Sequence, residues 1–114
     1  MDLNKYRDLC YQIAKDKGWY DEESNDDIMF PTRLALIHSE VSEALEEFRN
    51  NHQINITYYN AGSMKPEGIP TELADVLIRI FDLCGCHGID IESAVKKKIN
   101  YNTTRSYRHG NKKV

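Results

Sequence analysis

One stretch of the sequence restricts the possible folds more than any other. From residue 71 to about 87 two apolar stripes recur at helical spacing, so that little of the helix circumference is polar. The first stripe is Leu73, Val76, Leu77, Ile80 and Cys84, and the second is Ala74, Ile78 and Phe81. Such a helix is central in its fold. We expect a second copy of the chain to cover the second stripe, with coverage by the N-terminal helix as the alternative.

Three further helices are predicted around this central one. Apolar residues recur at steps of three and four over residues 2–17 and again over residues 31–50, with Pro tolerated in the first turn of the latter. Thr71 is the expected N-cap of the central helix. Asp90 is expected to cap a fourth helix over about 91–102, after a stop near Gly88.

The segments between these helices have no clear regular structure. Residues 21–27 are polar and acidic, and residues 51–70 contain turn signals without a helical pattern. Ile54, Ile56 and Tyr58 alternate with polar residues, which leaves a short strand or hairpin open as an alternative.

At 114 residues the chain is long enough for one domain and too short for two. Residues 1–114 are therefore predicted to form a single all-α, four-helix bundle-like domain that ends in a basic tail at about 103–114. No apolar run approaches the roughly 18 residues of a membrane span, and the first residues lack the pattern of a signal peptide. The three cysteines show no disulfide-framework spacing, which favours reduced thiols and a cytoplasmic location.

The net charge of -3 conceals a strong asymmetry along the chain. Residues 95–114 carry seven Lys or Arg and no Asp or Glu, whereas the rest carries 8 basic and 18 acidic groups. A basic tail on an acidic body is typical of a nucleic-acid-binding arm. It equally suits a small polyanion whose metal ion is held by the acidic body, so composition leaves both alternatives open.

Two pairs of carboxylates accompany the apolar stripes of two helices. Glu40 and Glu43 are three residues apart and share a helix face, and Glu72 and Asp75 repeat this spacing on the central helix. If the stripes pack together, the four carboxylates face one another near the core. They would repel one another unless cations held them, and all-oxygen ligands suit Mg²⁺ or Mn²⁺.

These carboxylates have two other interpretations. Glu is common on solvated helix faces, so either pair alone could be ordinary surface charge. A di-iron bundle is disfavoured, because it uses Glu-x-x-His on its helices and no Glu of this chain has a His three residues later.

With these motifs in place, the sequence resembles the MazG-like nucleoside triphosphate pyrophosphohydrolases of the all-α NTP pyrophosphatase superfamily. Two segments carry the motif pair E-x-x-E and E-x-x-D: residues 36–49 (LIHSEVSEALEEFR) and residues 65–79 (KPEGIPTELADVLIR). Residues 100–110 (NYNTTRSYRHG) are similar to the closing segment of the family. Together with the region around Gly18 and Trp19, the resemblance spans most of the chain.

The resemblance implies a MazG fold and Mg²⁺-dependent hydrolysis between the α and β phosphates, giving a nucleoside monophosphate and pyrophosphate. It implies Glu40, Glu43, Glu72 and Asp75 as the catalytic metal ligands. Many family members carry a further Glu directly before the first motif Glu, where this chain has Ser39. That departure leaves a metal-activated water or one of the four carboxylates as the proton acceptor.

Candidate substrate-binding residues lie outside the carboxylate pairs. Lys98, Asn102 and Arg105 are spaced four and three apart, and their cationic members suit phosphate oxygens. The alternative is charge that complements the helix dipole. Trp19 offers a flat apolar partner for a nucleobase, or it is an ordinary core or interface residue.

Two further residues near the motifs have structural interpretations. His38 is more typical of a core or interface histidine than of a group that contacts a base. Arg79 lies one turn after Asp75 and is expected to pair with Asp75 or Asp82.

The sequence as a whole favours a homo-oligomeric nucleotide pyrophosphohydrolase, either a dimer or a dimer of dimers. A non-catalytic helical module that binds nucleotide or metal as a regulator is the alternative from another class. A nucleic-acid-binding protein is a third, disfavoured by the acidic body and by the lack of interleaved aromatic residues in the tail. No feature of the sequence identifies the preferred base or sugar.

Overall fold

Helices account for the regular structure of the computed structural model, which describes residues 1–22 and 25–114. They are α1 (Leu3–Asp16), α2 (Asp26–Arg49), α3 (Ile69–Cys86), α4 (Ile91–Thr104) and the short α5 (Arg108–Asn111). Within these described ranges there is no strand, so the all-α prediction is confirmed. No helix in the same ranges is long and apolar enough to cross a membrane.

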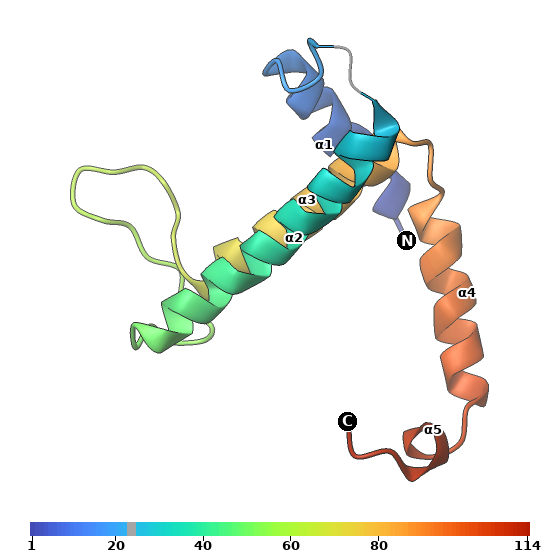
Figure 1. Cartoon of the computed structure of the whole chain (residues 1–114). Coiled ribbons are helices and arrows are strands. Elements are labelled where there is room, and N and C mark those ends of the chain that lie inside the picture. Colours follow the sequence, from blue (N-terminus) through green and yellow to red (C-terminus); the bar gives the residue numbers. More distant parts are fainter. Residues whose placement is uncertain (23–24) are drawn as a thin grey trace.

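The central position predicted for α3 is confirmed. It packs along α2, which runs in the opposite direction, and also against α1 (Figure 1). The fourth helix, α4, packs chiefly against α1, and most of its length stands away from α2 and α3 (Figure 1). The structure is thus a closely packed group of three helices from which α4 and α5 project.

The contact between α1 and α3 depends on one glycine. A Cβ atom at Gly85 would lie 2.5 Å from Cβ of Tyr11 and 3.1 Å from the carbonyl oxygen of Arg7, so only glycine lets the two helices approach this closely. Nearby, the rings of Tyr6 and Phe81 stack with centroids 6.1 Å apart. Helix α1 therefore covers the second apolar stripe of α3 at Phe81, whereas Ala74 and Ile78 remain exposed.

Helix α2 begins earlier than its sequence predicts. The prediction placed its start at Pro31–Thr32, but the helix starts at Asp26, and Pro31 lies in its second turn. The cause is a local cap: the side chain of Asn25 accepts a hydrogen bond of 2.8 Å from the backbone N–H of Asp27. Residues 23 and 24 of the predicted acidic loop lie outside the described residues, and Asp26 and Asp27 form the first turn of α2.

Helix α3 also begins earlier than predicted. Its N-cap is Gly68, not Thr71, and the Thr71 hydroxyl donates to the carbonyl oxygen of Gly68 at 3.0 Å. Gly68 has φ +119°, and a Cβ there would lie 2.5 Å from the carbonyl oxygen of Ile56, so the loop requires glycine at this point. The hairpin alternative for this loop reduces to a single antiparallel bridge between Tyr58 and Glu67.

The predicted cap of α4 is confirmed. Asp90 accepts a hydrogen bond from the backbone N–H of Ser93 at 3.0 Å, and the helix runs to Thr104. The start of α4 is held to α1, since Asn4 donates to Asp90 at 3.0 Å and the backbone N–H of Leu3 donates to Glu92 at 3.0 Å. At its far end, the hydroxyls of Thr103 and Thr104 donate only to carbonyl oxygens of α4 itself.

Little apolar surface is buried within one chain. The buried apolar residues of the described ranges are Ala44, Ile69, Leu83 and Cys84. The radius of gyration is 17.0 Å, whereas a compact domain of this length has about 13 Å. Single chains with so small a core are marginally stable, so the architecture is suited to association.

Candidate metal centre

The carboxylate pairs occupy neighbouring positions on the two packed helices α2 and α3. Glu40 and Glu43 come from the middle of α2, and Glu72 and Asp75 come from the first two turns of α3. Each pair is three residues apart, so each spans about one helical turn on a single face. α2 and α3 run antiparallel, and their register brings the second half of α2 beside the beginning of α3.

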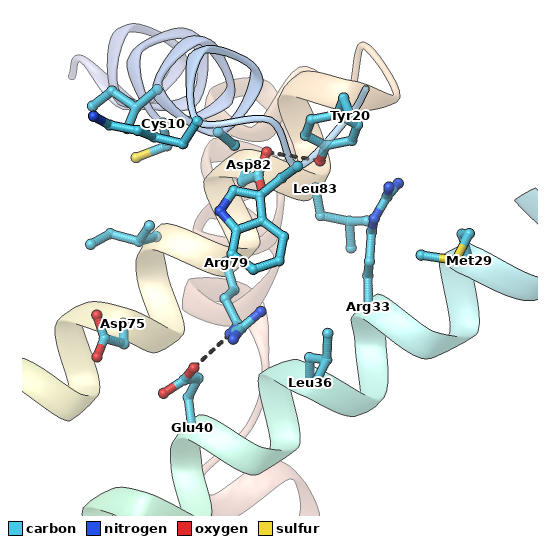
Figure 2. A pocket seen from close by; sticks show the side chains of 15 residues that line it. Cys10, Tyr20, Met29, Arg33, Leu36, Glu40, Asp75, Arg79, Asp82 and Leu83 are labelled. Atoms are coloured by element: carbon cyan, nitrogen blue, oxygen red, sulfur yellow. Dashed lines mark hydrogen bonds and ion pairs between the residues drawn. The ribbon is translucent and has the colours of Figure 1, made fainter. Parts of the chain in front are cut away.

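Glu40 is the carboxylate closest to the core. It is 8% exposed, and its Oε1 accepts a hydrogen bond of 2.6 Å from Nε of Arg79, drawn as a dashed line in Figure 2. Arg79 therefore pairs with Glu40 across the two helices and not with Asp75 or Asp82, the partners expected from sequence spacing. The guanidinium fixes the orientation of the Glu40 carboxylate at one end of the group.

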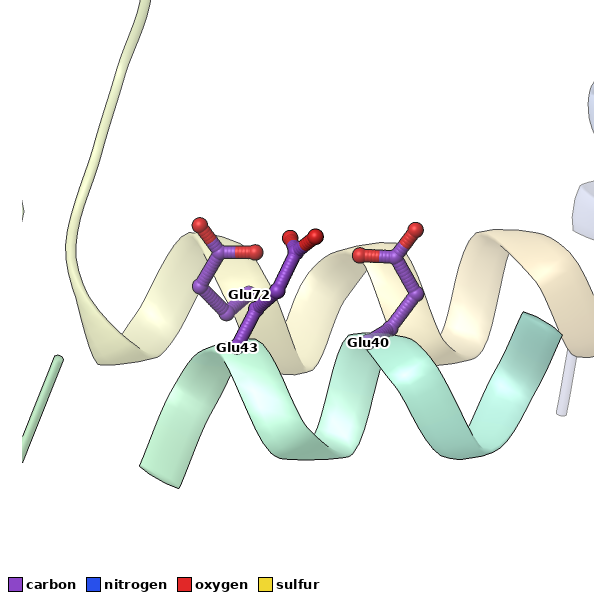
Figure 3. Close-up of side chains that lie close together, drawn as sticks. All are labelled: Glu40, Glu43 and Glu72. Carbon is purple, nitrogen blue, oxygen red and sulfur yellow. The ribbon is translucent and has the colours of Figure 1, made fainter. Parts of the chain in front are cut away.

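Three carboxylates come together on one side of the helix pair. One oxygen each from Glu40, Glu43 and Glu72 lies within 4.8 Å of the other two. Figure 3 shows the three side chains ending on the same side of α2 and α3. Spacing of this kind is compatible with shared coordination of a cation, because the ligand atoms converge from two rigid helices.

The proximity of these groups changes their acidity. The pKa of Glu72 is raised from 4.5 to about 7 by partial burial, by hydrogen bonding to Glu43, and by the charges of Glu43, Asp75 and Glu40. Its Oε2 is buried and has no hydrogen-bond partner among the described residues. Buried polar atoms are normally paired, so this oxygen, which lies beside other carboxylates, is in a position that a cation would satisfy.

Asp75 lies beside the other three carboxylates rather than within their closest group. Partial loss of solvation and then the charges of Glu40 and Glu43 raise its pKa, opposed by Arg79 and Lys65. The Asp75 side chain also lines the neighbouring cavity. Since Glu40 lines the same cavity, the carboxylates and the cavity adjoin at these two residues.

A cavity of about 630 Å³ adjoins the carboxylates between α1, α2 and α3. Its wall includes Trp19 and Tyr20 after α1, Arg33 and Leu36 from α2, and Ile78 and Asp82 from α3. Figure 2 labels Tyr20, Arg33, Leu36 and Asp82 among them. This volume lies in the range of ordinary small-molecule sites. The structure thus places Trp19 in the same cavity as Glu40 and Asp75, although the indole itself is largely exposed.

Three polar residues of the cavity wall form a network that the sequence did not reveal. The hydroxyl of Tyr20 donates to Asp82 at 2.8 Å, and the guanidinium of Arg33 lies 4.6 Å from the centre of the Tyr20 ring. Burial raises the pKa of Asp82, opposed by the Tyr20 hydrogen bond and the charges of Arg33 and Arg79. No short-range spacing relates residues 62 positions apart, so only the fold brings Tyr20 to Asp82.

A second unexpected network joins the end of α2 to the following loop. The Tyr58 hydroxyl donates to Glu47 at 2.9 Å, and the His52 ring stacks on Tyr58 with centroids 4.6 Å apart. Loss of solvation, then the Glu47 hydrogen bond and nearby carboxylates, raise the pKa of Tyr58 to about 12. Glu47, one turn after Glu43 along α2, is thereby occupied by a protein donor.

The predicted phosphate-binding residues lie apart from the carboxylates. Lys98, Asn102 and Arg105 are exposed in the second half of α4 and directly after it, and this part stands clear of α2 and α3 (Figure 1). Within one chain they do not reach the carboxylate group. His38 is exposed on α2, and the thiols of Cys10, Cys84 and Cys86 are free.

Comparisons of the chain with models of protein families, with curated proteins and with solved structures find no match. The family resemblance of the sequence motifs therefore stays a prediction, and the support for a function comes from the geometry of the site itself.

Proposed function

We propose that the chain is a Mg²⁺-dependent nucleotide pyrophosphohydrolase. It would cleave a (deoxy)nucleoside triphosphate between the α and β phosphates and release a nucleoside monophosphate and pyrophosphate. The observation that carries this proposal is the convergence of Glu40, Glu43 and Glu72 within 4.8 Å, with Asp75 beside them.

The residues present fit a hard divalent cation. All the available ligand atoms are carboxylate oxygens, which Mg²⁺ prefers and Mn²⁺ accepts. A cation would also give the buried Oε2 of Glu72 a partner and relieve the repulsion that raises the pKa of Glu72. When bound, Mg²⁺ supplies charge neutralisation and polarises phosphate oxygens.

The chain's own residues hold and orient the reacting groups in this proposal. Arg79 keeps the Glu40 carboxylate in one orientation through its 2.6 Å hydrogen bond. Ser39 offers no carboxylate, and its hydroxyl donates to the carbonyl oxygen of Leu36 at 2.6 Å. Either one of the four carboxylates would therefore accept the proton of the attacking water, or a bound cation would lower the pKa of that water so that it reacts as hydroxide without a separate base.

The adjoining cavity is the proposed site for the nucleoside. Trp19 provides a flat apolar surface for a base, and Asp82 and Arg33 of the same cavity wall provide an acceptor and a donor. Asp75 lines the cavity on the side of the carboxylate group. A nucleotide could then place its base in the cavity and its phosphates at the carboxylates.

We also infer that the chain acts as a homo-oligomer, either a dimer or a dimer of dimers. The support is the small core of the single chain and its large radius of gyration, 17.0 Å. A second copy would bury apolar surface that the chain leaves exposed, which is the main source of association free energy.

A pyrophosphate-release screen over common and damaged triphosphates, with and without Mg²⁺, tests the proposed activity. We expect monophosphate and pyrophosphate in equal amounts from at least one triphosphate, only with the cation. Glu46→Gln is the matched control, because Glu46 lies on the same helix, is exposed and pairs with Arg49. Nucleotide binding without turnover would support the regulatory alternative, and neither binding nor turnover would contradict both.

A further inference from the structure

Arg79 stands where the carboxylates meet the cavity. Its Nε donates to Oε1 of Glu40 at 2.6 Å, and Glu40 is one of the three carboxylates that converge within 4.8 Å. The Arg79 side chain also lines the cavity. Along α3, Asp75 precedes Arg79 by four residues and Asp82 follows it by three, so all three share one helix face (Figure 2). A ligand that extends from the cavity to the carboxylates would therefore pass Arg79.

The ion pair with Glu40 occupies only the Nε atom of this guanidinium. Among the described residues, Nη1 and Nη2 of Arg79 have no hydrogen-bond partner. The side chain is 41% exposed, which leaves these two groups accessible to a ligand. They present paired N–H donors in a planar fork, the geometry that fits two oxygens of one phosphate group.

Two other cations line the cavity, but they lie elsewhere on its wall. The guanidinium of Arg33 is 4.6 Å from the centre of the Tyr20 ring, and its Nη1 donates to the thiol of Cys86 at 3.6 Å. Lys17 is exposed directly after α1. In the described part of the chain, neither cation forms an ion pair with the four carboxylates. Arg79 is thus the cavity cation that is joined to the carboxylates.

This position determines which part of a nucleotide Arg79 would meet. In the proposed function the nucleoside lies in the cavity and the phosphates lie at the carboxylates. The α-phosphate joins the nucleoside to the other two phosphates, so it is the group that lies at the junction. The β and γ phosphates then lie beyond Arg79, toward Glu43 and Glu72.

We infer that the Nη groups of Arg79 bind the α-phosphate of the nucleotide while its Nε holds Glu40. One side chain then anchors the substrate and orients a carboxylate of the candidate metal centre. The identity of the ligand rests on the proposed function. Because the α-phosphate stays with the nucleoside after cleavage, Arg79 also retains the monophosphate in the cavity when pyrophosphate leaves.

A purely structural role for Arg79 gives a different expectation. If the guanidinium only joins α3 to α2 through Glu40, its loss changes stability and the binding of every cavity ligand alike. If the Nη groups bind phosphate, its loss weakens the binding of a monophosphate far more than that of the matching nucleoside. The ratio of these two affinities therefore separates the two roles.

Fluorescence of Trp19 measures this ratio without catalysis. Trp19 is the only tryptophan of the chain and lines the cavity. Each variant is titrated in Mg²⁺ with nucleoside monophosphates of the common bases, in ribo and deoxy forms, and with the matching nucleosides. For the wild type we expect at least one monophosphate to bind about tenfold or more tighter than its nucleoside, as a charge-assisted hydrogen bond supplies.

Arg79→Gln should remove most of this preference and leave the nucleoside affinity nearly unchanged. Arg79→Lys should be intermediate, because Lys keeps the charge but lacks the paired donors. Arg33→Gln is the matched control: it removes the same charge from the same cavity wall, away from the carboxylates, and should keep the wild-type ratio.

An unchanged ratio in Arg79→Gln would overturn the inference, as would a wild type that binds no monophosphate more tightly than its nucleoside. If Arg79→Gln fails to fold because buried Glu40 loses its partner, Arg79→Lys decides, and a wild-type ratio in that variant overturns the inference. Pyrophosphate release without an Arg79-dependent preference would retain the proposed function and reject the phosphate subsite. An Arg79-dependent preference without pyrophosphate release from any triphosphate would retain the subsite and reject the proposed hydrolysis.

Discussion

Glu72 is the carboxylate whose negative charge is most disfavoured by its surroundings. One of its oxygens is buried without a partner among the described residues, and three further carboxylates surround it. The pKa of about 7 follows from this, since each neighbouring negative charge favours the protonated form. In the absence of metal, the site stores unfavourable electrostatic energy at neutral pH.

The pH dependence of stability reveals this energy. Between pH 4.5 and about pH 7, folded Glu72 binds more proton than unfolded Glu72, so its contribution makes the metal-free protein less stable as the pH rises through this window. In EDTA, the melting temperature should therefore fall more between pH 5 and pH 8 in the wild type than in Glu72→Gln. Mg²⁺ should reduce the wild-type difference. Equal differences in the wild type, Glu72→Gln and the control Glu46→Gln would contradict repulsion at Glu72 as the cause.

Sequence spacing was sufficient to bring the carboxylates of one helix together, because three residues along an α-helix fix the geometry. It was insufficient for contacts between helices. Arg79 was expected to pair with Asp75 or Asp82, but it reaches Glu40, since the register of α2 against α3 depends on packing along both helices. The Tyr20–Asp82 hydrogen bond has the same origin.

At the scale of elements, the approach of α1 to α3 depends on the absence of a side chain at Gly85. The atoms nearest to a Cβ placed at Gly85 include Cβ of Tyr11 and the backbone carbonyl oxygen of Arg7, and neither can move away by a side-chain rotation. An added methyl group must therefore move one helix from the other. This contact positions Trp19 and Tyr20, which follow α1 and line the cavity.

Gly85→Ala should consequently destabilise the protein. The gain in helix propensity is about 1 kcal/mol, whereas overpacking a close contact costs about 1–3 kcal/mol. We expect the cost to prevail because backbone atoms must shift. Chemical denaturation measures the change in free energy of unfolding, and Gly85→Val should cost more than Gly85→Ala. An unfolding free energy equal to or above that of the wild type in both variants would contradict the close contact.

The start of a helix was predicted correctly from the sequence where one side chain was the clear cap. Asp90 caps α4 as predicted, because its carboxylate accepts directly from the backbone N–H of Ser93. The start of α2 was misplaced, since Pro31 resembled a first-turn residue while Asn25 supplies the cap six residues earlier. Likewise, Thr71 resembled an N-cap, yet the N-cap is Gly68, three residues earlier, and the helix begins at Ile69.

At the scale of the whole molecule, the single chain leaves exposed many large apolar side chains of the kind that a folded domain usually buries. Its second α3 stripe, the feature that suggested oligomers from sequence, is partly covered by α1 at Phe81. The larger uncovered surface is the exposed apolar stripe of α2 together with two leucines of α3: Leu34, Val41, Leu45 and Phe48, and Leu73 and Leu77. The sequence identified α3 as central but not which side would stay open, because that depends on where α1 docks.

Light scattering at micromolar concentration tests the association directly. We expect a mass of two or four chains for the wild type, since burial of apolar surface stabilises association by about 25 cal/mol per Å². Leu45→Glu should shift the mass toward one chain by placing a charge in the interface. Glu46→Gln, its neighbour outside the exposed apolar stripe of α2, should not. A 13.2 kDa species for the wild type would contradict the oligomer.

The metal site itself is tested most directly by amide substitution of its carboxylates. Glu43→Gln and Asp75→Asn keep the side-chain shape and remove the charge that would hold Mg²⁺. Mg²⁺-dependent pyrophosphate release should fall by about a hundredfold or more in each variant. Stability in EDTA should stay level or rise as repulsion is relieved. Wild-type pyrophosphate release by both amide variants would contradict the metal site, and with it the proposed function.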